Sequence, residues 1–333
     1  MSLSASIAMC TYNGAKFLEK QLQSFLEQTV LPDELIVCDD GSTDGTVKIL
    51  ESFAAKSPFP VQIHRNEKNL GYVRNFEKAG ALCSKEIVYF SDQDDIWLPE
   101  KNEKTLNIFQ EYTNIGLVLL NAQLMDAQDN LLPVSARAQK QMDREKALPD
   151  AEPFFVINGL HRWIVSWQGC NMAYRNSQKE LIYPVGSEMG HDQWILLLLG
   201  VLSDTVFLRQ PTLLHRIHSD NASRLSCIKR NLISRAFYSI RRHQDPFRYE
   251  LKASLFEHLL ERIRKNQELI RHPELLPVFE RFFVHLSTRA EALRNPWKRP
   301  KLLLREWLNG NYGFCSRGFS DVLSDFLAFP IKK

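Results

Sequence analysis

The sequence has 333 residues, enough to bury the core of one large domain or of two modest ones. Its 44% hydrophobic and 24% charged residues are typical of a globular protein, and its longest apolar run, residues 194–202, is too short to span a membrane. The net charge of +3 is unevenly distributed, because residues 228–333 carry 21 Lys or Arg against 11 Asp or Glu, which leaves the preceding part acidic. An acidic part suits a metal site, and a basic part suits phosphate, anionic lipid or nucleic acid.

Strands and helices alternate through the first part of the chain. Short runs rich in β-branched and aromatic residues predict strands, and apolar residues at helical spacing predict helices. The predicted strands are residues 5–10, 34–38, 61–64, 87–90 and 115–120, and the predicted helices between them are residues 17–26, 46–53, 72–82 and a helix opened by Pro99. Because short turns join these elements, the sequence predicts an α/β protein with a doubly wound, mostly parallel sheet.

The pattern becomes irregular from residue 126 to 158, where prolines interrupt a polar stretch, and we expect a surface loop or lid there. Strand character returns at residues 163–174, and a helix at 190–199 precedes short strands at 205–208 and 211–218. Basic, amphipathic helices are predicted at residues 228–240, 249–270 and 275–293. We therefore expect two domains, comprising residues 1–225 and 226–333.

The six cysteines are scattered, with no C-x-x-C pair and no Cys/His spacing typical of a metal site. The sequence also does not begin with a secretory leader. We interpret the cysteines as reduced thiols and expect a cytoplasmic protein.

Three carboxylates, Asp92, Asp94 and Asp95, directly follow the predicted strand at residues 87–90. In open α/β sheets ligands bind at the carboxyl ends of strands, and carboxylate oxygens suit Mg²⁺ or Mn²⁺ shared with a phosphate. The alternative is a solvated acidic turn that caps the next helix, and a D-x-D pattern alone favours that alternative.

Three motifs decide between these interpretations. S-I-A-M-C-T-Y-N-G, L-I-V-C-D-D-G-S-T-D-G-T and F-S-D-Q-D-D-I-W, in this order, resemble the inverting glycosyltransferases of family two, which have the nucleotide-sugar-binding GT-A fold. The resemblance covers roughly the first 220 residues. D-Q-D-D-I-W, together with Q-G-C-N-M-A-Y-R and H-R-I-H-S-D-N, looks most like the bacterial rhamnosyltransferase branch, which builds surface polysaccharides.

The resemblance implies a donor site at the ends of the first strands. Asp40 is similar to the acid that hydrogen-bonds the nucleotide base, and the same pocket would be lined by Thr11, Tyr12 and Asn13. Arg74 would meet a phosphate, although an exposed helix arginine is the alternative. Asp92 and Gln93 are also implied in binding the nucleotide sugar, a dTDP or UDP derivative.

The resemblance also implies a divalent cation, Mg²⁺ or Mn²⁺. Asp94 is the expected direct ligand, Asp92 is expected near both the ribose and the metal, and His218 resembles a histidine that completes such sites. The alternative for His218 is a structural role at a strand end. Asp95 receives no role from the resemblance, and a helix N-terminal acid is its simplest interpretation.

An inverting transfer needs a base that removes the proton of the acceptor hydroxyl. The family places this base at the start of a helix, and G-H-D-Q-W at residues 190–194 fits, so Asp192 is the implied catalytic base. Its alternative is an ordinary helix N-terminal acid. His191 replaces the commoner Glu of this pair, so its role is open. With it, the acceptor side would comprise Trp167, Gln168, Gly169 and Cys170; the alternative for Trp167 is a place in the core.

The expected activity is therefore transfer of a sugar, first of all rhamnose from dTDP-rhamnose, onto a saccharide or polyprenyl-linked glycan. The alternatives are a UDP-hexose or UDP-N-acetylhexosamine donor, or a non-catalytic module that binds nucleotide or saccharide. The basic residues 226–333 would lie on the inner membrane surface, or form a bundle that packs on the catalytic domain or on a second subunit. Nucleic acid is not expected as a partner, because acidic and apolar residues interleave with the basic ones.

Overall fold

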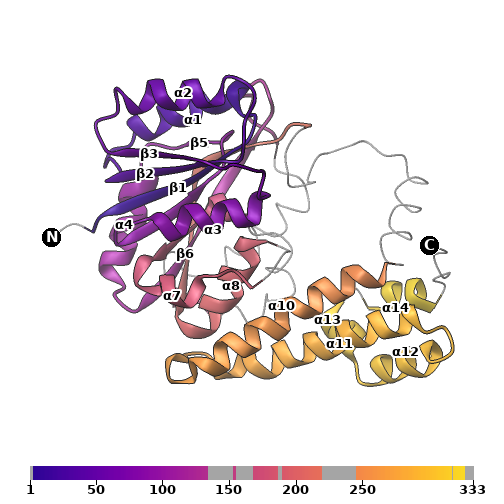
Figure 1. The fold of residues 1–333 in the computed structure, drawn as a ribbon. Helices are drawn as coiled ribbons and strands as arrows, with labels where there is room; N and C mark the ends of the chain where they lie inside the picture. Colours follow the sequence, from indigo (N-terminus) through magenta and orange to yellow (C-terminus); the bar gives the residue numbers. More distant parts are fainter. Residues whose placement is uncertain are drawn as a thin grey trace. The chain divides into compact units, whose positions relative to one another are not determined.

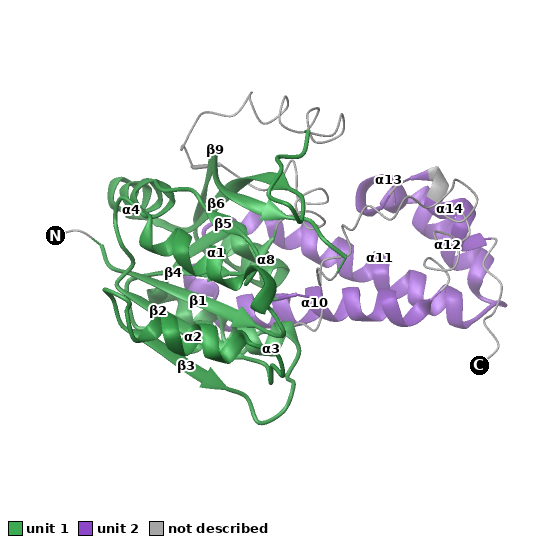
Figure 2. Cartoon of the chain, turned by 90° about the horizontal axis from the view of Figure 1, so that it is seen from above, with its two compact units in different colours: residues 1–156, 167–185, 191–226 green, residues 157–166, 186–190, 227–333 purple. Residues whose placement is uncertain are grey.

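The computed structural model describes residues 3–133, 153–154, 168–186, 190–219, 245–316 and 318–326 (Figure 1). The chain divides into two compact units (Figure 2). The first unit comprises residues 1–156, 167–185 and 191–226, and the second comprises residues 157–166, 186–190 and 227–333.

The first unit is built on one mixed sheet with the strand order β3-β2-β1-β4-β8-β6-β9-β5. Its strands are β1 (Ala5–Thr11), β2 (Glu34–Asp39), β3 (Val61–Arg65), β4 (Ile87–Ser91), β5 (Ile96–Trp97), β6 (Ile115–Met125), β7 (Pro153–Phe154), β8 (Met172–Arg175) and β9 (Asp204–Arg216). Strands β3, β2, β1 and β4 are parallel, and β9 is parallel to β6. Strand β8 runs antiparallel to both of its neighbours, and β7 pairs antiparallel with β9 off the main order. The predicted α/β class is therefore confirmed.

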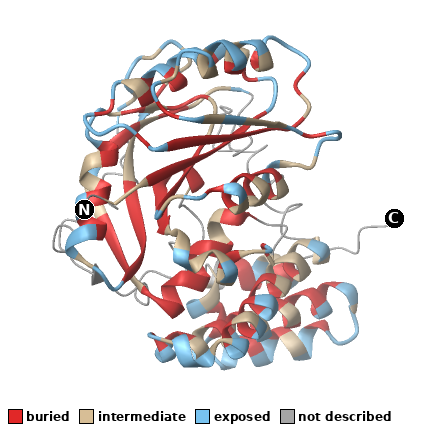
Figure 3. Cartoon of the chain, turned by 60° about the vertical axis from the view of Figure 1, so that its left-hand side comes forward, coloured by how far each residue is buried: buried red, intermediate tan, exposed pale blue. Residues whose placement is uncertain are grey.

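Helices cover both faces of this sheet. They are α1 (Ala15–Leu26), α2 (Thr46–Ala54), α3 (Tyr72–Leu82), α4 (Lys101–Glu111), α7 (Lys179–Ile182) and α8 (His191–Leu202), with 3-10 turns η2 (Gly169–Asn171) and η3 (Asn176–Gln178). Helices α1 and α2 lie on one face and α3 and α8 on the other (Figure 1). Strands β1, β2 and β4 are buried along their whole length, which explains their continuous apolar sequences (Figure 3).

The strand order creates a switch point between β1 and β4. From β1 the chain moves outward through β2 to β3, and it then returns to form β4 on the opposite side of β1. The connections that leave the carboxyl ends of β1 and β4 therefore diverge, and such a divergence opens a crevice in α/β sheets. Thr11 and Ser91 are the last residues of these two strands.

Two predictions about the second half of this unit were wrong in detail. Residues 205–208 and 211–218 do not form two strands, because β9 continues through Pro211. The pairing of β9 with β6 is irregular around Asn121 and Pro211, and this irregularity accommodates a residue that lacks an N–H donor. Of the strand predicted at residues 163–174, the structure describes only the part after 167, where η2 precedes β8.

The second unit is helical in the residues that the structure describes. Its helices are α10 (Pro246–Lys265), α11 (Leu276–Arg294), α12 (Arg299–Leu308), α13 (Asn311–Cys315) and α14 (Phe319–Phe326), with 3-10 turns η4 (Gln267–Leu269) and η5 (Pro273–Leu275). Buried Arg289 donates to both carboxylate oxygens of Asp325, at 2.7 and 2.9 Å, and to Tyr249 Oη at 2.9 Å. The predicted helix at residues 228–240 lies outside the described residues. No helix among the described residues is both long and apolar enough to cross a membrane.

Candidate functional site

The loops that follow β1 and β2 are braced against each other. The Asn13 N–H donates to Ser42 Oγ at 2.9 Å, and Asn13 Oδ1 accepts from the Thr43 N–H at 2.9 Å. Asn13 adopts a positive φ of 47°, a conformation that Asn tolerates better than most residues. Fully buried Asp39 accepts from Thr11 Oγ1 at 2.8 Å. The Thr11 hydroxyl thus points into the protein, while Tyr12, the residue after β1, is 51% exposed.

Asp40 fastens the loop between β3 and α3. Its Oδ1 accepts from Asn66 Nδ2 at 2.8 Å and from the Leu70 N–H at 2.7 Å, and its Oδ2 accepts from the Gly71 N–H at 2.9 Å. Gly71 has a φ of 77°, which glycine adopts without strain. A carboxylate oxygen can accept two hydrogen bonds, so Oδ2 retains one acceptor position. Sequence reasoning missed this bracing role.

Gln93 joins the two sides of the switch point. Its Oε1 accepts from the Tyr12 N–H at 2.8 Å, and its Nε2 donates to the Tyr12 carbonyl at 3.1 Å. A Cβ on Gly14 would lie 2.1 Å from Gln93 Oε1, so a glycine at position 14 makes room for this amide. Because both ends of the amide are engaged by one backbone residue, the geometry makes Gln93 a brace for the loop that presents Tyr12.

The predicted acidic residues converge with a histidine from the end of β9. His218 Nε2 lies 2.8 Å from Asp94 Oδ2, and the His218 ring packs on Phe17 with centroids 4.8 Å apart. Burial, together with the charges of Asp95 and Asp94, raises the pKa of Asp92 to about 7. Such crowding of carboxylates is what a divalent cation relieves.

In their chemistry, Asp92, Asp94 and His218 suit a divalent cation of the Mg²⁺ or Mn²⁺ type, but their ligand atoms do not gather within 4.8 Å of one another as those of another trio of described residues do. Two carboxylates are ligands that both ions accept, and an imidazole suits Mn²⁺ better than Mg²⁺. The carboxylates follow β4 and the imidazole follows β9, and the hydrogen bond between Asp94 and His218 shows that the fold brings these segments together.

Asp95 has a separate, structural partner. It is fully buried, and its Oδ1 lies 2.9 Å from His215 Nδ1 and 3.0 Å from the Arg216 backbone nitrogen. Burial opposes ionisation of Asp95, but the charge and hydrogen bond of His215 outweigh it and hold the pKa of Asp95 below its usual value. Burial likewise lowers the pKa of His215, but Asp95 reverses the effect and raises it to about 9. The two side chains therefore form a buried, hydrogen-bonded pair.

A buried thiol stands beside this pair. Ligand atoms of Asp95, Cys170 and His215 lie within 4.8 Å of one another. Burial raises the pKa of the Cys170 thiol far above its usual value. Asp95 and His215 already engage each other, and Asp95 also accepts from the Arg216 N–H, so we assign these residues to the scaffold of the site.

Residues 168–170, which the sequence predicts to face an acceptor, are held by contacts with β9 and α4. Gln168 Nε2 lies 3.0 Å from His215 Nε2. Fully buried Lys101 donates from Nζ to the Cys170 carbonyl at 3.0 Å and lies 3.9 Å from the centroid of the Trp97 ring. Burial lowers the pKa of Lys101 to about 7. Trp167, predicted on this side, lies outside the described residues.

His191, the first residue of α8, is packed among aromatic rings. Its ring stacks on Phe76 with centroids 4.2 Å apart and meets Phe90 edge-on at 4.9 Å. Neither ring nitrogen has a hydrogen-bond partner within the described part of the chain, and burial lowers the pKa of His191 to about 3. A Cβ on Gly169 would lie 2.4 Å from His191 Nε2, so Gly169 leaves room for the ring. The imidazole is therefore neutral.

Asp192 follows His191 in the first turn of α8. Its Oδ1 accepts from the Gln193 N–H at 2.8 Å, and burial raises its pKa to about 6. His191 contacts Phe90, which lies two residues before Asp92, so the start of α8 stands beside the carboxyl end of β4. The fold thus brings Asp192 to the same edge of the sheet as the acidic residues.

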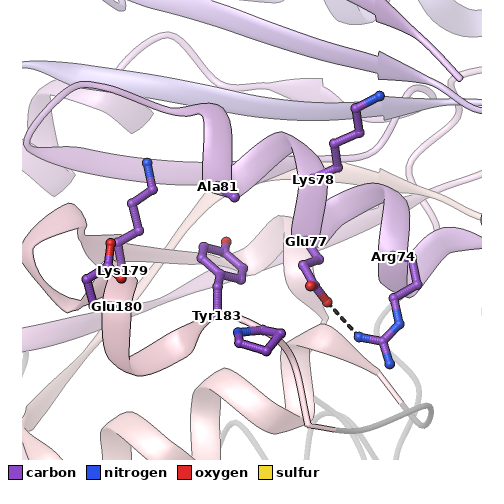
Figure 4. Close-up of a pocket in the computed structure, with 8 residues that line it drawn as sticks. Arg74, Glu77, Lys78, Ala81, Lys179, Glu180 and Tyr183 are labelled. Atoms are coloured by element: carbon purple, nitrogen blue, oxygen red, sulfur yellow. Dashed lines mark hydrogen bonds and ion pairs between the residues drawn. The ribbon is translucent and has the colours of Figure 1, made fainter.

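Arg74 makes contacts other than the phosphate contact suggested by the sequence. Its Nη1 donates to Glu77 Oε2 at 2.7 Å and to the Val185 carbonyl at 3.0 Å. It lines a cavity of about 420 Å³ whose other walls are Glu77, Lys78, Ala81, Lys179, Glu180, Tyr183 and Pro184 (Figure 4).

Tyr72, which sequence reasoning missed, is 50% exposed with its ring centroid 6.5 Å from that of His191. Its position directly after Gly71 at a helix start was the available signal.

Known proteins resemble this chain in sequence and in fold. Residues 6–155 match the Glycosyl transferase family 2 model. An uncharacterised glycosyltransferase of Nostoc sp. is 23% identical over 219 residues, which cover 65% of each chain. The chondroitin synthase of Escherichia coli is 32% identical over 127 residues, 38% of this chain and 18% of that protein. The dTDP-rhamnosyl transferase RfbG of Shigella flexneri is 27% identical over 222 residues, 64% of this chain and 72% of RfbG.

The match spans less than two thirds of the Nostoc protein and less than a fifth of the chondroitin synthase. Among solved structures, S. aureus TarS in complex with UDP superposes with a TM-score of 0.58 at 16% identity, covering 97% of this chain and 89% of that chain. A Pyrobaculum calidifontis mannosyltransferase in complex with GDP-Man and Mn²⁺ gives 0.51 at 17% identity, covering 98% and 86%. These likenesses confirm the GT-A fold.

Proposed function

We propose that this chain, a member of glycosyltransferase family 2 through its residues 6–155, moves a sugar from a nucleoside diphosphate onto a saccharide or lipid-linked saccharide. The observation that carries the proposal is the convergence of Asp94 and His218 at the switch point of the sheet, with Asp192 at the start of α8 on the same edge. Ligands bind at such a switch point in open α/β sheets.

The donor would bind across the loops that follow β1, β2 and β4. The half-exposed ring of Tyr12 would lie against the nucleotide base, and the remaining acceptor position on Asp40 Oδ2 would meet a ring N–H. Asn13 and Gln93 would hold the Tyr12 loop in place. Arg74 lies on α3 and is hydrogen bonded to Glu77 and to the Val185 carbonyl, and it would meet a phosphate of the donor.

Asp92, Asp94 and His218 are the residues that would hold a divalent cation. When bound, the cation would neutralise the charge that develops on the departing diphosphate. His218 Nε2 lies 2.8 Å from Asp94 Oδ2, so the two side chains would meet the same cation. The buried pair of Asp95 and His215 would fix the backbone between the two segments, because Asp95 also accepts from the Arg216 N–H.

Asp192 would act as the general base. The acceptor oxygen forms the new bond to the anomeric carbon, the bond to the diphosphate breaks with its electron pair leaving on the phosphate oxygen, and the acceptor proton passes to Asp192. The raised pKa of about 6 keeps Asp192 ionised at pH 7 yet makes it a stronger base than an ordinary aspartate. Neutral His191 adds no charge beside it.

The first candidate donor is dTDP-rhamnose, supported by the likeness to RfbG over 222 residues. A UDP-sugar is the second candidate, since TarS, which shares the fold, was crystallised with UDP and with UDP-GlcNAc. Mn²⁺ is the first metal to test, because the mannosyltransferase complex contains it.

Isothermal titration of the chain with dTDP-rhamnose, UDP-GlcNAc and GDP-mannose, each with and without Mn²⁺, tests donor and metal together. We expect one nucleotide sugar to bind at least about tenfold more tightly than the others, and only with Mn²⁺ present. Equal, weak binding of all three regardless of Mn²⁺ would leave a non-catalytic module as the better description.

A further inference from the structure

Helix α12 leaves three of its apolar residues exposed. Leu304, Trp307 and Leu308 are 47%, 50% and 77% exposed, whereas Arg299 and Glu306 on the opposite side are 7% and 1% exposed. An ordinary surface helix turns its apolar stripe toward the core and its charges toward water. Helix α12, which lies at one end of the second unit beside α13 and α14 (Figure 2), buries Leu303 in this way, but it also buries Arg299 and Glu306 while three further apolar side chains stay exposed.

The inward polar residues hold this orientation. Arg299 Nε donates to the Ala292 carbonyl at 3.1 Å. Glu306 Oε2 accepts from Asn311 Nδ2 at 2.8 Å and pairs with His285 Nδ1 at 2.8 Å. Buried polar groups with partners of this kind are costly to expose or to leave unpaired. A rotation of α12 that buried the leucines and tryptophan would break these contacts, so the exposed apolar surface is built into the fold.

Trp297 extends the apolar surface just before the helix. It is 95% exposed, which is unusual for the largest apolar side chain. Lys301 and Arg305 are exposed at the i−3 positions of Leu304 and Leu308, so they lie beside the same stripe. Neither cation forms an ion pair with an acidic side chain in the described residues, whereas nearby Lys298 pairs with Glu291 at 3.0 Å.

We propose that the face formed by Trp297, Lys301, Leu304, Arg305, Trp307 and Leu308, hereafter the α12 face, docks on a membrane surface that contains anionic lipid. Tryptophan and leucine would enter the boundary between headgroups and acyl chains, with the cations against the anionic headgroups. The 10 residues of α12 are too few to span a bilayer, so the helix would lie in the plane of the interface.

The charges select lipid over a second copy of this chain. In a two-fold contact through the α12 face, the same patch would meet itself and bring Lys301 and Arg305 close to their own equivalents. Like charges brought together disfavour such a contact. An anionic leaflet supplies the opposite charge along the whole face. The inference concerns a surface of the second unit alone and does not depend on the identity of the sugar donor.

The test is co-sedimentation of the full chain with vesicles of phosphatidylcholine alone and of phosphatidylcholine with 30% phosphatidylglycerol. We expect binding to the anionic vesicles that weakens as salt is raised. The Trp297→Ala/Trp307→Ala variant should bind at least about tenfold more weakly through lost apolar area. The Lys301→Gln/Arg305→Gln variant should lose about 30-fold and bind both vesicle types alike.

A matched control removes an exposed cation and an exposed leucine elsewhere on the same unit, as Lys265→Gln/Leu269→Ala. This control should bind as the unaltered chain does. Unchanged circular dichroism would show that each variant is folded, since every altered side chain is exposed. Failure of the unaltered chain to bind anionic vesicles, or equal binding by all three variants, would overturn the proposal. So would a dimer, seen in analytical ultracentrifugation, that the tryptophan variant dissociates.

Discussion

Replacing Asp192 by Asn should stabilise the protein while it abolishes sugar transfer. Burial raises the pKa of Asp192 from its ordinary 3.8 to about 6, so ionising this carboxylate costs the folded state free energy. A shift of about two units corresponds to about 3 kcal/mol, an upper value for a partly exposed side chain. The folded state binds the proton more tightly than the unfolded chain, so the penalty is absent below pH 4, grows between pH 4 and 6, and is complete above pH 6.

The Asn variant escapes this penalty and can still accept from the Gln193 N–H through Oδ1. Urea unfolding followed by circular dichroism at pH 7.5 should show a gain of about 1–3 kcal/mol, falling to about half at pH 5. Release of nucleoside diphosphate from the donor selected by titration should fall by about 10²–10⁴. In the unaltered chain, the same activity should decline as pH falls through about 6, because the base becomes protonated.

Glu51→Gln is the matched control, since Glu51 is an exposed acid on α2. Its neutralisation should change stability by less than about 1 kcal/mol and leave transfer intact. Full turnover by the Asp192→Asn variant would refute the role of Asp192 as base. A variant less stable than the unaltered chain at pH 7.5 would refute the reasoning from burial.

Three further substitutions test the scaffold of the site and of the helical unit. Gln93→Ala removes two hydrogen bonds across the switch point, so nucleotide should bind more weakly in titration while the melting temperature falls only slightly. Gly169→Ala should cost about 1–3 kcal/mol in urea unfolding through its clash with His191, and adding His191→Ala should recover part of that loss; strict additivity would contradict the clash. Arg289→Leu should cost about 3–5 kcal/mol or unfold the helices, because it leaves Asp325 buried without its cation; a loss below about 1 kcal/mol would show that the pair is not buried in solution.

The sequence predicted those parts of the fold that depend on local pattern. The buried strands β1, β2 and β4 are continuous apolar runs, and α1 to α4 show helical spacing, so their existence follows from residues close in the chain. Because ligands gather at the carboxyl ends of parallel strands, the same pattern placed Asp92 and Asp94 at an edge of the sheet. Asp94 and His218 are hydrogen bonded to each other, and their role as metal ligands stays a prediction.

Local sequence patterns do not predict contacts between residues that are far apart in the chain. Asp95 and His215 are 120 residues apart, and the pairing of β5 with β9 brings their segments together. The bracing of the loop after β3 by Asp40 likewise depends on backbone donors, whose positions no side-chain pattern records. Strand β9 was divided at Pro211 in the prediction because a proline within a strand is normally a boundary, and the irregular pairing with β6 overrides that rule.

Whether Asp94 helps to hold a divalent cation can be measured directly. Electron paramagnetic resonance of free Mn²⁺ reports how much of the ion is bound as the selected nucleoside diphosphate is added. We expect one Mn²⁺ bound per chain in the presence of nucleotide, nearly complete loss in Asp94→Asn, and no change in Glu51→Gln, which alters an exposed acid on α2. Undiminished nucleotide-dependent Mn²⁺ binding by Asp94→Asn would contradict a cation site at the end of β4.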